Sequence, residues 1–171
     1  MHFINFGFKF VVMPASVSPV KKTGIIVFFI TAISLCCSFK TGMNDQDWLS
    51  WANRCLTQSY DPSGDAKLKK FELAVTGDYF LRLRKTYAKG KQEYYSFNLH
   101  HLDDMNYLGN TASGTLALKT IADDIIVQTY NDRAGDVDSM TTVLNIPVKN
   151  MEPERLDSLR DALNYFKAKG L

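Results

Sequence analysis

The fold is decided by a stretch of alternating side chains, Phe71-Glu-Leu-Ala-Val-Thr-Gly-Asp-Tyr-Phe-Leu-Arg-Leu-Arg84. On both sides of its centre, apolar residues recur at every second position, which places them on one face of an extended strand. The central Thr76-Gly77-Asp78 has the residue types of a tight turn. The stretch therefore predicts an antiparallel hairpin that turns a row of leucines toward a core and Arg82 and Arg84 away from it.

The same period of two continues from Lys67 to about Val148. Further strands are predicted at Tyr95–Leu99, Leu116–Leu118, Ile125–Tyr130 and Leu144–Val148, with a shorter pattern at Asp104–Leu108. Most connections between these segments are short, so neighbouring strands are expected to be antiparallel. A longer polar loop is expected over residues 131–139, before the last strand.

Amphipathic helices are predicted on both sides of the strands. The first has a cap at Asn44 or Asp45, and Trp48 and Trp51 fall on its apolar face, which we interpret as a packing surface. The second opens at Pro153, a residue suited to the first helical turn. Together the elements predict an α+β fold: a strongly bent, mostly antiparallel sheet of six or seven strands, with an N-terminal helix and a C-terminal capping helix.

The first 38 residues have the features of a targeting segment. Lys21-Lys22 precede an apolar run from Ile25 to Cys37, which is shorter than the roughly 20 residues of a spanning helix and typical of a signal peptide. A start at Met13 gives this leader an ordinary length, and a longer leader is the alternative. The 171-residue chain is thus divided into a targeting segment (1–38), a tether with the N-terminal helix (39–66) and a β-rich domain with the C-terminal helix (67–171).

Two cysteines at the end of the apolar run leave the fate of the leader open. Cys36 and Cys37 resemble the lipidation site of bacterial lipoproteins, although bulky Leu35 stands where that signal has a small residue. Acylation there would tether the domain to a membrane surface. Cleavage after Ser38 is the competing prediction and would release the domain. Cys55 lies on the apolar helix face and is expected to be a buried thiol.

The basic isoelectric point belongs to the leader. Three of the 20 basic residues precede residue 39 and none of the 18 acidic residues does, so the remainder carries 17 basic against 18 acidic side chains. The chain therefore offers no charge argument for binding nucleic acid.

The order of elements in residues 67–168 resembles the pleckstrin-homology-like arrangement, in which a bent sheet is capped by its last helix. The resemblance also rests on the rhythm of Tyr95-Ser-Phe-Asn-Leu99 and Gly114-Thr-Leu-Ala-Leu118. The final helix has Tyr165 and Phe166 but no tryptophan, which that family commonly carries there, and the N-terminal helix lies outside the family pattern. A lipocalin-like barrel or another α+β roll predicts a similar string of elements.

Charge is segregated along the predicted domain. Residues 67–91 hold eight basic and two acidic side chains, and residues 92–138 hold eight acidic and two basic ones. Lys70, Arg82 and Arg84 are the candidate site for an anion or a partner protein, and they resemble the basic signature of phosphoinositide-binding pleckstrin-homology domains. The alternatives are a solvated outer face that keeps the sheet soluble, or charge complementarity within the fold or a dimer.

The sequence shows no catalytic signature. It has no nucleophile elbow, phosphate loop, dinucleotide fingerprint or zinc-protease motif. His100-His101-Leu-Asp103-Asp104 has metal-ligand types, but adjacent histidines of an extended chain point to opposite faces. The loop over residues 131–138 departs from the calcium-loop pattern. No catalytic, cofactor or metal residue is therefore assigned.

These features predict an exported or membrane-tethered binding module that is not an enzyme, located outside the cytoplasm. Its expected contacts are a membrane, through leader or lipid, and a protein or anionic ligand. Two alternatives stay open. One is a hydrolase or metal-dependent enzyme with a dispersed site near residues 100–104, and the other is a lipid-binding pleckstrin-homology-like module with a retained anchor.

Overall fold

The computed structural model describes residues 43–170. The predicted leader, the start at Met13 and the lipidation site at Cys36 or Cys37 lie outside the described residues. Within the described part of the chain, no helix is both long enough and apolar enough to cross a membrane.

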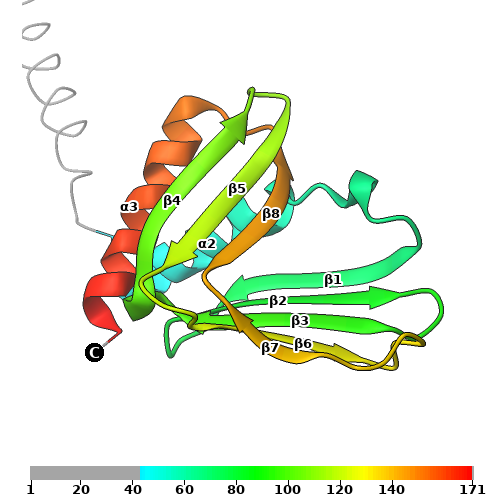
Figure 1. Cartoon of the computed structure of the whole chain (residues 1–171). Helices are drawn as coiled ribbons and strands as arrows, with labels where there is room; N and C mark the ends of the chain where they lie inside the picture. The colour runs from blue at the N-terminus through cyan, green and yellow to red at the C-terminus, as the bar shows by residue number, and fades with distance from the viewer. Residues whose placement is uncertain (1–42, 171) are drawn as a thin grey trace, which may run out of the picture. The chain divides into compact units, whose positions relative to one another are not determined.

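Eight strands form two antiparallel sheets in this part of the chain, and a helix precedes and another follows them (Figure 1). The five-stranded sheet has the order β1-β2-β3-β6-β7 and the three-stranded sheet the order β4-β5-β8. The elements are α2 (Asp45–Ser59), η1 (Pro62–Gly64), β1 (Leu68–Val75), β2 (Phe80–Tyr87), β3 (Gln92–Asn98), η2 (Leu99–His101), β4 (Leu102–Gly109), β5 (Ser113–Thr120), β6 (Ile125–Tyr130), β7 (Asp138–Thr141), β8 (Val143–Lys149) and α3 (Pro153–Lys169).

The predicted α+β class, with its antiparallel strands and two flanking helices, is confirmed. Two details differ from the expectation. The strands number eight in two sheets instead of six or seven in one bent sheet. The segment expected as a loop over residues 131–139 ends in β7, whose mostly exposed residues pair with β6 from Gln128↔Asp138 to Ile125↔Thr141. A short strand without apolar alternation leaves no period-two signal.

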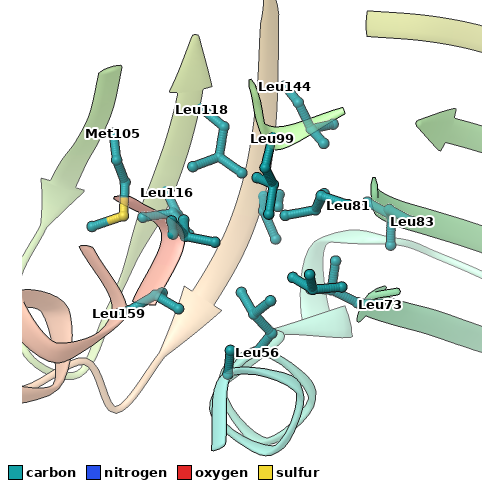
Figure 2. Packing of buried hydrophobic residues seen from close by; sticks show 14 of the residues in the cluster. Leu56, Leu73, Leu81, Leu83, Leu99, Met105, Leu116, Leu118, Leu144 and Leu159 are labelled. Carbon is teal, nitrogen blue, oxygen red and sulfur yellow. The ribbon is translucent and has the colours of Figure 1, made fainter. Parts of the chain in front are cut away.

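The chain passes from one sheet to the other at η2. Leu99, fully buried, begins this turn, and the side chain of Asn98 accepts a hydrogen bond from the backbone of His100 at 2.9 Å. After β4 and β5 the chain returns to pair β6 with β3. Figure 2 shows leucines from both sheets and both helices, among them Leu81, Leu116 and Leu159, pointing into one shared core.

Helix α2 covers the edge strand β1. The side chain of Asn53 donates a hydrogen bond to the Val75 carbonyl at 2.9 Å and accepts one from the Val75 amide at 2.6 Å. Thr57 donates a further bond to the Leu73 carbonyl. These bonds satisfy backbone groups that an edge strand otherwise leaves open to pairing with another chain. Helix α2, which was grouped with the tether on the basis of the sequence, is therefore packed as part of the domain.

The tryptophan pair packs as expected. Trp48 stacks on Tyr165 of α3 with the ring centres 5.9 Å apart, and its edge meets Trp51. Both rings are partly buried against the core. Cys55 is buried, and the guanidinium of Arg155 donates a hydrogen bond to its sulfur. These contacts fasten the two helices together.

Candidate functional site

The inner face of the five-stranded sheet changes from apolar to polar along the strands. Its first row, Val75, Leu81 and Phe97, is buried under the helices. Two rows further along, the residues that share this face across β1, β2, β3 and β6 are Phe71, Lys85, Glu93 and Thr129. The sheet thus extends beyond its core and ends in a charged surface.

Lys85 is the deepest charge of this surface. Its side chain is 11% exposed and its Nζ lies 2.8 Å from Oδ2 of Asp65, whose side chain is 20% exposed. The same carboxylate oxygen accepts a hydrogen bond from the hydroxyl of Tyr60 at 2.8 Å. The Tyr60 ring is buried, stacks on Phe71 and has the Lys85 ammonium 6.0 Å from its centre. A charge placed among aromatic rings in this way requires a partner, which Asp65 supplies.

The protonation states follow from these contacts. Burial acts to raise the pKa of Asp65, but the hydrogen bonds from Lys85 and Tyr60 outweigh it, so the pKa lies below its ordinary value. Burial, and then the bond to Asp65, raise the pKa of the Tyr60 hydroxyl. Asp65 is therefore an anion at neutral pH, and the Tyr60 hydroxyl keeps its proton and donates a hydrogen bond to it.

A second ion-paired group lies beside the first. Lys91 Nζ is 3.0 Å from Glu93 Oε1 and 2.9 Å from Asp132 Oδ2, and the hydroxyl of Tyr87 donates to Glu93 at 3.0 Å. Hydrogen bonds to Asp132 and Glu93 raise the pKa of Lys91. Lys91 lies in the basic part of the sequence and Asp132 in the acidic part. Their ion pair links the β2–β3 turn to the β6–β7 connection.

A pocket of about 400 Å³ opens over these groups. The β2–β3 turn and the β6–β7 connection that border it lie together at the end of the five-stranded sheet that points away from α3 (Figure 1). The lining residues are Gly64, Asp65, Ala66, Lys67, Tyr87, Lys89, Lys91, Glu93, Asn131, Asp132 and Arg133. The size lies within the range of small-molecule sites, and three separate segments of the chain contribute to it.

The basic residues proposed from the sequence lie elsewhere. The strand register places Lys70, Arg82 and Arg84 on the outer face of the same sheet, opposite the pocket, as the alternation predicts. Lys70 pairs with Glu72, and Arg82 lies 3.7 Å from Asp78. The guanidinium groups of Arg82 and Arg84 stand over the rings of Phe80 and Tyr94. The three side chains share a face, and each has a protein neighbour.

The histidine segment is not assembled into one centre. His100 and His101 lie in η2, and His101 Nδ1 is 3.0 Å from Asp124 Oδ2. Asp103 faces Lys119, and Asp104 accepts hydrogen bonds from the Met105 amide and Asn106. Over residues 43–170, no three side chains of metal-ligand type lie close enough to hold an ion.

Sequence reasoning missed the pocket, although one signal pointed to it. Lys85 continues the inward phase of Leu81 and Leu83, so a period of two already places its charge on the buried face. An inward lysine needs an acidic partner. That partner, Asp65, precedes β1 in an irregular segment, and no pattern in the sequence connects the two.

No protein family matches the chain, and no curated protein or solved structure matches it either.

Proposed function

We propose that this protein is a non-enzymatic binding module whose ligand is a small molecule held in the pocket at the open end of the five-stranded sheet. The observation that carries this proposal is the pocket itself, about 400 Å³, built over ion-paired and hydrogen-bonded side chains from three separate segments. Concave sites with a few convergent polar groups are the usual form of a ligand site.

The chemistry of the lining favours binding over catalysis. A general base works best with a pKa near the operating pH, but hydrogen bonds and ion pairs hold the pKa of Asp65 and of Asp132 below the ordinary value. Burial and hydrogen bonds raise the pKa of Tyr87, so its hydroxyl remains protonated. These side chains therefore keep their protonation states near neutral pH. They can fix the shape of the pocket and donate hydrogen bonds to a ligand.

A panel of probes tests the proposal. Glucose, lysine, citrate and inorganic phosphate are titrated separately into the isotopically labelled full chain at millimolar concentration, and amide chemical shifts are followed by NMR. We expect at least one probe to move the signals of Ala66, Lys89 and Arg133 in a saturable way, because these residues line the pocket. Asn145, on β8 in the other sheet, serves as the reference.

The outcome is decisive in both directions. If every probe leaves the pocket signals unchanged, the pocket is not a small-ligand site. If the saturable shifts instead follow Arg82 and Arg84, the ligand binds the outer face of the sheet, as the sequence alone first suggested.

We also propose that the domain works outside the cytoplasm, on the strength of the basic pair and apolar run in residues 21–37. Intact mass of the protein recovered from fractionated cells checks this. We expect a mature chain that begins at acylated Cys36 or Cys37, or one that begins at Phe39. An unprocessed chain facing the cytoplasm would contradict export and would favour the retained-anchor alternative.

A further inference from the structure

We propose that the pocket recognises an anionic group of its ligand, a carboxylate or a phosphate, through the side chains of Lys67, Lys89 and Arg133. This inference rests on the pocket being the ligand site, as proposed above. It assigns the chemistry of the ligand, which the binding proposal leaves open.

The first argument is the distribution of charge in the lining. Each carboxylate of the pocket is already ion-paired: Asp65 with Lys85, while Glu93 and Asp132 share Lys91. Lys85 and the lining residues together hold five cations against three carboxylates, so the balance is positive. The remaining cations of the lining, Lys67, Lys89 and Arg133, have no acidic partner within 4 Å among the residues that the structure describes. The pocket therefore presents positive charge that no protein group satisfies.

The second argument is convergence. Lys67 comes from the connection before β1, Lys89 from the β2–β3 turn, and Arg133 from the connection between β6 and β7. All three residues are exposed and line the same pocket, and like charges that face one space repel one another unless an anion lies between them. Cations from three distant segments at the rim of one pocket form a site suited to a shared anion.

The third argument is backbone conformation at Lys67. Its φ is +74°, in the left-handed region that a residue with a side chain rarely adopts. Its carbonyl accepts a hydrogen bond from the Ala88 amide at 2.9 Å, which fastens it to the β2–β3 turn. β1 carries a register irregularity immediately afterwards, between Leu68 and Lys70. The left-handed conformation at Lys67 therefore carries a conformational cost that glycine would not have.

The substitution Lys67→Gly separates the binding role of the Lys67 side chain from the conformational role of its backbone. It keeps the backbone hydrogen bond to Ala88 and relieves the left-handed conformation, so the unfolding midpoint is expected to stay equal or rise. Binding of citrate or phosphate, measured by isothermal titration calorimetry on the full chain, is expected to weaken about tenfold, since a charge-assisted contact is lost.

Two further variants provide controls. Lys67→Asn tolerates the left-handed backbone without the charge and is expected to weaken anion binding like Lys67→Gly. Lys70→Ala removes the same charge from the outer face, outside the pocket lining, and is expected to leave anion binding within about twofold of the unmodified chain.

The outcomes distinguish this inference from the binding proposal. Saturable binding of glucose or lysine in the pocket, without binding of citrate or phosphate, overturns the anion assignment and leaves a ligand pocket in place. Anion binding that Lys67→Gly and Lys67→Asn leave unchanged also overturns it. If no probe binds in the pocket, both the ligand-pocket proposal and the anion assignment are overturned.

Discussion

Replacing Phe166 by alanine is expected to lower the free energy of unfolding by about 3–5 kcal/mol, the usual result of truncating a buried phenylalanine. Phe166 is 0% exposed in α3, and its ring stacks on Tyr79 with the centres 5.9 Å apart. Tyr79 lies in the hairpin between β1 and β2. The truncation therefore leaves a cavity between the last helix and the first hairpin.

Thermal unfolding of the full chain, followed by circular dichroism, checks this prediction. A loss of this size corresponds to a fall of roughly 10–20 °C in the midpoint for a domain of this length. Leu108→Ala is the matched control, because Leu108 is 70% exposed and its truncation is expected to change stability by less than about 0.5 kcal/mol. Equal effects of the two substitutions would contradict the packing of α3 described above.

Replacing Asp65 by alanine is the second large expected loss. The change leaves the ammonium of Lys85 buried without its carboxylate and leaves the Tyr60 hydroxyl without its acceptor. We expect a loss of about 2–3 kcal/mol, somewhat less than for a fully buried pair, because both side chains keep some access to water. Chemical denaturation at neutral pH measures it.

Adding Lys85→Met to Asp65→Ala is expected to restore at least half of this loss. The double variant removes the stranded charge and keeps a side chain of similar length, and an apolar replacement of a buried ion pair is often close to neutral. If the double variant is as unstable as Asp65→Ala, the loss does not come from an unpaired Lys85 charge.

The stability difference between the unmodified chain and Asp65→Ala is expected to depend on pH. The folded pKa of Asp65 lies below its unfolded value. The contribution of Asp65 is therefore fully present above the ordinary pKa of an aspartate, about 3.9, and is lost as the pH falls through the folded value. The stability difference between the unmodified chain and Asp65→Ala should shrink toward low pH. A difference that grows on acidification would contradict the pairing.

Much of the fold can be predicted from local patterns in the sequence. The turn at Thr76-Gly77-Asp78 is predicted between the two strands that flank it. The last helix is predicted to be amphipathic and to cap the sheet, and its Leu159, Leu163 and Phe166 are all buried. These features depend on neighbours in the sequence. Periodicity and turn chemistry are sufficient to predict such elements.

The division of the strands into two sheets could not be predicted from the sequence. β4 and β5 pair with each other as a local hairpin, but β6 then pairs with β3, and β8 pairs with β5. Strand patterns give the faces of a strand but not its partner, since any strand with an apolar face can pair with several others. The pleckstrin-homology-like resemblance, drawn from the order of elements, stays a prediction, as do the leader and its processing.

The sequence by itself determined the first hairpin: Phe71 to Arg84 alternates so that one face is apolar and the outer face carries Arg82 and Arg84. The same alternation places Lys85 on the inner face, but only the tertiary structure decided that Asp65 pairs with it there and that a charged pocket opens beside it. The physical reason is distance along the chain. Lys85 is paired with Asp65, twenty residues earlier, and Lys91 with Asp132, which follows four further strands.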